Sequence, residues 1–212
     1  MKKILFLSAI LHITNIIYSQ DGPGIFDGQS DVGNTTIKGN CSYNVETQSY
    51  TLTGSGNNIW FNHDGFHFVW KKMKGDFILR ANGMLLGKGT EEHRKIGWMI
   101  RNSLDSNSAH VSATVHGDGL TALQYRKKNN DSMGELRSPV NAPDVIELER
   151  RGNAYIMNVA RNGELFTSTY LTDAPLNDEV YIGVFICSHN NAVSEKGSFY
   201  NVRIVQPAGP TL

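Results

Sequence analysis

The sequence predicts an all-β fold, either a sandwich or a barrel built from short antiparallel strands. Apolar and polar residues alternate with a period of two in many short runs, which is typical of strands with one face in a core. Gly, Pro, Asn and Asp separate these runs about every 8–12 residues, the spacing found in β-sandwiches. After the N-terminal segment, no stretch keeps the helical period of 3.6 residues.

Turn residues bound the first predicted strands. We expect an irregular arm or an edge strand at Phe26–Gly33. A hairpin is then expected, in which Lys38–Val45 pairs with Ser49–Thr53 and Glu46–Gln48 makes the turn.

The stretch from Gly54 to Phe77 is the most informative part of the chain, because it contains two of the three tryptophans. Aromatic residues occupy every second position of Phe66–Trp70. This alternation predicts a strand in which Phe66 and Phe68 face the core and His67 faces the opposite side.

The remaining strands are predicted at short intervals along the chain. They are Asp76–Met84, Ile96–Arg101, Val111–His116, Leu123–Arg126, Ile146–Glu149, Ala154–Ala160, Glu164–Tyr170, Val180–Cys187 and Ser198–Val205. The segment Asn129–Asp144 is polar and contains two prolines, so we expect a long loop there. Val180–Cys187 contains only apolar or small residues, and both its faces should be buried.

The N-terminal segment is predicted to be a secretory signal peptide comprising residues 1–19. Lys2 and Lys3 precede an apolar run that ends at Ser19, a small residue suited to signal peptidase. Polar residues interrupt this run, which argues against a membrane anchor. We therefore expect a single domain over residues 20–212, located in the periplasm or secreted. The whole chain has a formal net charge of 0, so neither nucleic acid nor, after signal cleavage, a membrane is an expected partner.

The chain has two cysteines, Cys41 and Cys187. Export makes a disulfide between them chemically feasible, and two buried free thiols are the alternative. The sequence leaves both open because it fixes no Cα–Cα distance. No metal site is expected, since no pair of histidines or cysteines has ligand spacing. No cofactor is expected, and a structural calcium ion is left open.

Several motifs occur in the same order as in one family of secreted bacterial modules. They are Tyr50–Trp60, Asp64–Trp70, Gly75–Phe77, Gly97–Arg101, Leu148 with Arg150, Gly152 and Asn153, Tyr181–Val184, Ser188–Asn190 and Phe199–Val202. In these motifs the chain resembles the DUF1349-like modules of the concanavalin A-like lectin/glucanase superfamily. The resemblance covers nearly all of the chain after the predicted signal peptide, and it implies a jelly-roll β-sandwich of two antiparallel sheets. Lectins, glycosidases, lyases and adhesive modules all share that fold, so it implies no single function.

Polar side chains of several predicted strands lie opposite the apolar side chains of the same strand. They are Arg101, Ser112, Thr114, Gln124, Arg126, Glu147 and Glu149. If the strands are neighbours, these groups meet on one sheet surface, where hydrogen bonds and an aromatic platform such as Trp60 or Tyr125 could bind a glycan. The alternatives are an ordinary solvated face with Arg–Glu pairs and, for Trp60, a position in the core.

Glu147 and Glu149 are candidates for a catalytic pair. Side chains two residues apart on a strand point the same way, about 7 Å apart at the backbone, which forbids neither a retaining nor an inverting glycosidase. The DUF1349-like modules are not defined by these positions, however, and the related glucanases use a longer acidic motif than this chain has. Catalysis is therefore the second hypothesis.

Three polar residues inside the shared motifs, His67, Arg101 and His189, form a further candidate group. A histidine beside an arginine and an acid could transfer protons in a lyase or hydrolase, with His67 as the candidate. The alternative is a polar network that holds loops together. Asp64 and Asn190 are expected to have this structural role.

The preferred functional hypothesis is a secreted module that binds a polysaccharide or oligosaccharide without chemistry of its own. A glycoside hydrolase or polysaccharide lyase that uses the same sheet cleft is the first alternative. A structural or adhesive module that binds another protein is the second alternative.

Overall fold

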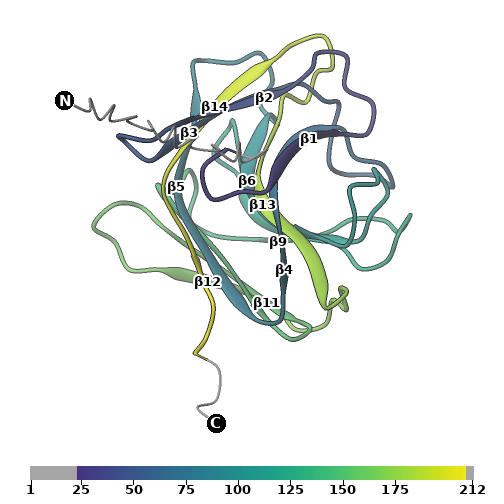
Figure 1. Cartoon of the computed structure of the whole chain (residues 1–212), viewed down its shortest axis with the longest axis vertical. Helices are drawn as coiled ribbons and strands as arrows, with labels where there is room; N and C mark the ends of the chain where they lie inside the picture. The colour runs from purple at the N-terminus through teal and green to yellow at the C-terminus, as the bar shows by residue number, and fades with distance from the viewer. Residues whose placement is uncertain (1–22, 209–212) are drawn as a thin grey trace, which may run out of the picture.

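The computed structural model describes residues 23–208, which form a β-sandwich of two antiparallel sheets, each with seven strands (Figure 1). The predicted all-β fold with two antiparallel sheets is therefore confirmed. The predicted signal peptide at residues 1–19 lies outside the described residues. No helix capable of spanning a bilayer occurs among residues 23–208.

The first sheet, sheet A, is a mixture of early and late strands. In spatial order its strands are β1 (Gly28–Val32), β4 (Phe66–Lys74), β13 (Glu179–Cys187), β6 (Lys95–Arg101), β7 (His110–His116), β8 (Thr121–Arg126) and β9 (Gly134–Arg137). The predicted edge strand near residues 26–33 is present as β1, which pairs with β4 alone.

The second sheet, sheet B, packs against sheet A. In spatial order its strands are β12 (Thr167–Leu171), β11 (Ala154–Ala160), β10 (Val145–Arg151), β5 (Phe77–Leu86), β14 (Glu195–Val205), β3 (Ser49–Gly54) and β2 (Asn40–Asn44). The predicted first hairpin is present as β2 and β3. In Figure 1 the last strand, β14, drawn in yellow, runs beside β3 and β5, which are its neighbours in the sheet.

Alternate side chains of both sheets fill one large core between the layers. Trp98 of β6 and Val184 of β13 share this core with Leu79 of β5 and Leu148 of β10, and all four side chains are fully buried. Each such side chain contributes about 1.5–3 kcal/mol through its removal from water. The alternation in the sequence is therefore the direct cause of the sandwich.

The two faces of β4 differ from the prediction. Val69 belongs to the core between the sheets, whereas Phe66 and Phe68 pack in a second apolar cluster with Met99 and Phe185. Because side chains alternate along a strand, His67 lies on the same side as Val69, so the prediction that Phe66 and Phe68 face the main core is wrong. Both faces of β4 are apolar, and alternation alone cannot tell which face meets sheet B.

A second difference from the prediction is a strand that was not expected, β9. The segment Asn129–Asp144, expected to be a loop, contains β9, which pairs with β8 and forms an edge of sheet A. Four residues with a glycine at the start carry too weak an alternation to predict a strand. The expectation that Val180–Cys187 is buried on both faces is confirmed, since β13 contributes Val184 to one cluster and Phe185 to the other.

Candidate functional site

The outer face of sheet A, which points away from sheet B, is divided into a covered half and an open half. Residues 55–65, which we call the covering loop, pack over the covered half. Ile59 of this loop belongs to the second apolar cluster together with Phe68 and Phe185. The loop is closed at its base, where Ile59 and Asp64 form a bridge and the Gly65 N–H donates to the Asn58 carbonyl (2.8 Å).

A buried carboxylate fixes the covering loop to the sheet. Asp64 Oδ1 accepts from Arg126 Nη2 (2.7 Å), and Asp64 Oδ2 accepts from Arg126 Nη1 (3.0 Å) and Arg101 Nη2 (3.4 Å). All three side chains have 0% exposure. Most of the remaining guanidinium donors reach backbone carbonyls, among them those of Phe61 (2.6 Å) and Asp105 (2.6 Å), and Arg101 Nη1 contacts Met99 Sδ (3.6 Å). The two positive charges thus have a partner, which a buried ion cluster requires.

The open half of the face is a polar cleft of about 230 Å³ at the ends of β6 to β9. Its lining residues come from these strands, from the covering loop and from the segment after β13. They are Asn58, Trp60, His93, Lys95, His116, Leu120, Gln124, Glu135, Arg137 and His189.

A chain of hydrogen bonds crosses the floor of the cleft. Gln124 Nε2 donates to Glu135 Oε2 (2.8 Å) and lies 3.3 Å from His116 Nε2, while Arg137 Nε donates to Glu135 Oε1 (2.6 Å). Gln124 is 1% exposed, and its Oε1 atom has no hydrogen-bond partner. The floor therefore contains a buried acceptor that has no hydrogen-bond partner.

Lys95 places an ammonium group at the same floor. The residue is 2% exposed, and Nζ donates to Asn58 Oδ1 (2.9 Å). No carboxylate within the described part of the chain forms an ion pair with it. Burial lowers the pKa of Lys95 because desolvation penalises the charged form. Two of the three ammonium hydrogens remain available, so Lys95 adds donors beside the buried acceptor of Gln124.

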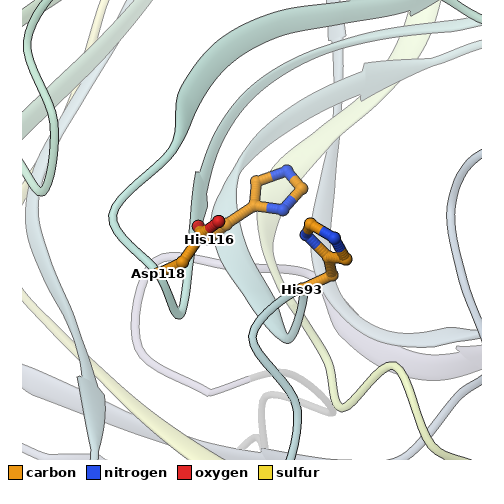
Figure 2. A group of neighbouring side chains, drawn as sticks. All are labelled: His93, His116 and Asp118. Atoms are coloured by element: carbon orange, nitrogen blue, oxygen red, sulfur yellow. The ribbon is translucent and has the colours of Figure 1, made fainter.

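Three histidines surround one end of the cleft. The ring of His93 lies 5.6 Å from that of His116 and 5.4 Å from that of His189, measured between centroids. Burial lowers the pKa of His116 to about 3, and the neighbouring Lys95 acts in the same direction. One ligand atom each from His93, His116 and Asp118 lies within 4.8 Å of the others (Figure 2), so these residues could hold a metal ion.

The structure brings together only some of the residues predicted to bind a ligand. Trp60, Gln124 and His189 line the cleft. Arg101 and Arg126 lie on the same sheet face but are fully buried under the covering loop, where they hold Asp64. Both arginines therefore belong to a polar network that holds a loop in place, which is the alternative that the sequence left open. The structural role expected of Asp64 agrees with this arrangement.

Glu147 and Glu149 do not lie on the face that carries the cleft. They belong to β10, in sheet B, whereas Gln124 and Arg126 belong to β8, in sheet A. Glu147 accepts a hydrogen bond from Asn158 Nδ2 (2.7 Å), and Glu149 pairs with Arg151. The expectation that these carboxylates converge with the other polar residues on one surface is therefore wrong. The alternation correctly identified a polar side on each strand, but the two sheets each have such a side, and in sheet A these residues are buried.

His67 is also separate from the cleft. It is 2% exposed, and its Nδ1 and Nε2 atoms lie 2.8 Å from Asp31 Oδ1 and 3.1 Å from Gln29 Oε1. Burial lowers the pKa of His67, and the hydrogen bond to Asp31 opposes that shift. Because both ring nitrogens are engaged by β1, His67 joins β4 to its neighbour and has no nitrogen left for a substrate.

Tyr125 does not take part in the cleft, and the two cysteines are not bonded to each other. Tyr125 packs against the core between the sheets, so it provides no aromatic platform in the cleft. Cys41 lies on β2 and Cys187 on β13, in different sheets, and both are free and buried. The disulfide left open by the sequence is therefore not formed, and the alternative of two buried thiols describes the structure.

Sequence reasoning missed Lys95, His93 and Glu135 as cleft residues. The signal for Lys95 was present, since it lies at the period-two spacing from Arg101 on one strand face. His116 likewise shares a face with Ser112 and Thr114. Glu135 could not be found in this way, because its strand was assigned to a loop. His93 precedes β6 and reaches the cleft only through the tertiary fold.

Comparisons with known proteins support the fold. No protein-family model matches the sequence, and no curated protein sequence matches it either. A functionally unknown protein from Saccharomyces cerevisiae has a similar structure, with a TM-score of 0.64, 14% sequence identity, and coverage of 85% of this chain and 97% of that chain.

Two further solved structures are more distant. The alginate lyase from Klebsiella pneumoniae has a TM-score of 0.51 at 9% identity, with 79% of this chain and 84% of that chain covered. Lectin II from Ulex europaeus has a TM-score of 0.49 at 11% identity, with 84% and 99% covered. The yeast protein and the Klebsiella lyase therefore support the assignment of the described residues to a jelly-roll β-sandwich.

Proposed function

We propose that the protein binds an oligosaccharide or polysaccharide in the cleft of sheet A, without chemistry of its own. The observation that carries the proposal is the unsatisfied floor of the cleft beside the half-buried Trp60. A sugar hydroxyl both donates and accepts hydrogen bonds, so it can accept from Lys95 Nζ and donate to the carboxylate of Glu135, both of which line the cleft. The indole of Trp60 offers an apolar surface on which a pyranose ring can stack.

The size and polarity of the cleft also support this proposal. A cleft of about 230 Å³ accommodates a short saccharide segment. The Klebsiella structure is that of an alginate lyase, so a related sandwich acts on a polysaccharide. The polar lining also argues against an apolar ligand.

Affinity gel electrophoresis with a panel of soluble neutral and acidic polysaccharides tests the proposal. We expect retardation by at least one polysaccharide. The variants Trp60→Ala and Glu135→Ala should each lose about tenfold in affinity, since each removes an interaction of about 1–1.5 kcal/mol. Tyr170→Ala is a matched control, because Tyr170 is 61% exposed on sheet B. Migration unaffected by every polysaccharide, or binding that both cleft variants retain in full, contradicts the proposal.

A polysaccharide lyase or hydrolase that uses this cleft is the second candidate. The observation that favours it is the meeting of Lys95, His116 and Glu135 in one cleft, because these residue types transfer protons in enzymes. The experiment is to incubate each retained polysaccharide with the protein and to measure newly formed chain ends. Product formation that disappears in Lys95→Met establishes the enzyme, whereas binding without products leaves the binding module.

We further propose that the chain is an exported DUF1349-like module, directed to the periplasm or secreted after cleavage following Ser19. The basic and apolar N-terminal segment and the shared motifs support this proposal. N-terminal sequencing of exported protein should give Gln20 as the first residue, and an uncleaved chain in the cytoplasm contradicts export. A structure of a DUF1349-like module that places the motifs Gly97–Arg101 and Ser188–Asn190 on unrelated strands contradicts the family assignment.

A further inference from the structure

Backbone hydrogen bonds bring three metal-ligating side chains to one end of the cleft. His116 is the last residue of β7, Asp118 lies in the turn that follows, and His93 precedes β6. The Gly117 N–H donates to the Arg94 carbonyl (2.8 Å), and the Asp118 N–H donates to the Glu92 carbonyl (3.0 Å). These two bonds lie on either side of His93 in the sequence, so the backbone fixes the segment of His93 against the turn of Asp118.

His116 is a buried imidazole with a free nitrogen on this side. The residue is 6% exposed, and its Nδ1 atom has no hydrogen-bond partner. Figure 2 shows the ring turned toward His93, with the Asp118 carboxylate beside it. A buried polar atom without a partner costs free energy, and a bound ion removes that cost.

His93 and Asp118 can adjust to an ion. Both are exposed, and no hydrogen bond of the described residues engages the ring of His93. Asp118 Oδ1 accepts from the Leu120 N–H (2.9 Å), which orients the carboxylate and leaves Oδ2 free. Ligand atoms around a tetrahedral zinc ion are about 3.4 Å apart, given bond lengths near 2.0–2.1 Å. Rotation of the two exposed side chains toward His116 closes the distance from the present limit of 4.8 Å.

We propose that His93, His116 and Asp118 bind a divalent transition metal ion of the zinc class. Two imidazoles and one carboxylate suit Zn²⁺, Co²⁺, Ni²⁺ or Cu²⁺, whereas Ca²⁺ and Mg²⁺ prefer sites made of oxygen ligands. Three protein ligands leave a fourth position for water, which faces the cleft. The proposal does not depend on carbohydrate binding, because its three ligand atoms belong to His93, His116 and Asp118 and none of them requires a bound sugar.

Gln124 supplies the supporting contact that a metal-bound histidine needs. A metal at Nδ1 places the ring proton of His116 on Nε2, which lies 3.3 Å from the Gln124 carboxamide. A half-turn of this amide directs Oε1, now without a partner, to accept that proton. The Glu135 carboxylate must then move away from Gln124, because two oxygens at the present 2.8 Å would repel each other. Glu135 then loses its bond from Gln124 and keeps the one from Arg137 (2.6 Å). The positive charge of the neighbouring Lys95 weakens the site, so we expect micromolar affinity.

Titration of the purified, chelator-treated full chain with Co²⁺ tests the proposal, because a low-symmetry Co²⁺ site has visible ligand-field bands. We expect bands that saturate at one equivalent and that one equivalent of Zn²⁺ removes. Calorimetry with Zn²⁺ should show at least a tenfold loss of affinity in His93→Ala, His116→Gln and Asp118→Asn. His63→Ala is the control, since His63 is exposed and does not line the cleft.

If His116→Gln folds poorly, the variants at the two exposed positions, His93 and Asp118, still test the proposal. His93→Ala and Asp118→Asn remove ligands from the surface and should leave the circular dichroism spectrum unchanged. The absence of ligand-field bands in the wild-type protein overturns the proposal. Zn²⁺ binding that survives in both of these variants overturns it as well, because the ion then binds to other histidines.

Discussion

At the scale of single residues, the most consequential group is the carboxylate of Asp64. It balances two arginines that have no access to water, and it also closes the covering loop. Buried ion clusters of this kind add little when complete and cost much when broken, because the remaining charges keep their desolvation penalty. Arg101 and Arg126, which the sequence predicted to bind a ligand, therefore hold the covering loop beside the cleft.

Asp64→Asn should lower the free energy of unfolding by about 3–5 kcal/mol, because Arg101 and Arg126 then lose the one carboxylate that pairs with them among residues 23–208. Urea denaturation followed by tryptophan fluorescence measures the change. Asp27→Asn is the matched control, since Asp27 pairs with Lys71 at the surface (2.7 Å) and should change stability by less than about 1 kcal/mol. Equal effects of the two substitutions contradict the assignment of Asp64.

His110 should make stability depend on pH. Burial lowers its pKa to about 3, and Arg101, Arg126 and Lys95 act in the same direction, while Asp64 opposes them. The unfolded chain binds the proton near pH 6.5, so the unfolded state gains protons first as the pH falls. Stability is therefore greatest above pH 6.5 and decreases toward pH 3.

Between pH 7 and pH 5, His110 should reduce the free energy of unfolding by about 2 kcal/mol. Both ring nitrogens of His110 lack hydrogen-bond partners, so His110→Leu should fold. Between pH 7 and pH 5 its free energy of unfolding should decrease by about 2 kcal/mol less than that of the wild type. Urea titrations at pH 7, 6 and 5 measure the two slopes. His63→Leu, an exposed substitution, should retain the wild-type slope. Equal slopes in His110→Leu and the wild type refute the prediction.

At the scale of elements, the covering loop depends on the backbone at its first turn. Gly56 has a φ of 137°, and a Cβ atom there would meet the carbonyl of Gly65 at the other end of the loop. Cys187 Sγ also contacts the carbonyls of Gly56 (3.5 Å) and Gly65 (3.3 Å), so β13 packs against this closure. The loop thus has one compatible conformation at its base.

Gly56→Ala should lower stability by about 1–3 kcal/mol, so the covering loop should open more often, together with the sandwich. Hydrogen exchange measures the opening at the Asp64 and Gly65 amides, which donate to Ser106 O and Asn58 O. Gly75→Ala is the control with a positive φ but open space, since Gly75 has a φ of 72° and a Cβ atom there would meet no other atom within 4 Å. Unchanged exchange at both loop amides in Gly56→Ala contradicts the prediction.

The strands themselves could be predicted from the sequence, whereas their partners could not. Alternation located β6, β7, β8 and β10 and identified the polar side of each. Pairing of β10 with β5 and β11, however, depends on which sheet a strand joins, and a local pattern contains no such information. Glu147 was for this reason assigned to the wrong surface. Gln124 was assigned to the surface that carries the cleft because β8 does lie beside β7.

At the scale of the whole molecule, sheet A is buried on both faces over part of its width. The core between the sheets lies on one side, and the second apolar cluster with the covering loop lies on the other. Both clusters include residues of β4, β6 and β13. The sequence indicated this arrangement only at β13, where no polar residue interrupts the strand after Glu179. The cleft therefore lies beside a region with apolar packing on two sides, which holds its walls in place.

This arrangement predicts that the covering loop unfolds together with the sandwich. Phe185→Ala removes an aromatic side chain from the second cluster and should lower the free energy of unfolding by about 3–5 kcal/mol. Ile182→Ala, on the opposite face of β13, should cost about 2–5 kcal/mol. Urea denaturation should show a lower midpoint for both variants with one transition each, because the two clusters share the same strands. If the loop instead opened independently, Phe185→Ala would increase hydrogen exchange in residues 55–65 and leave the global midpoint unchanged, which contradicts a single cooperative unit.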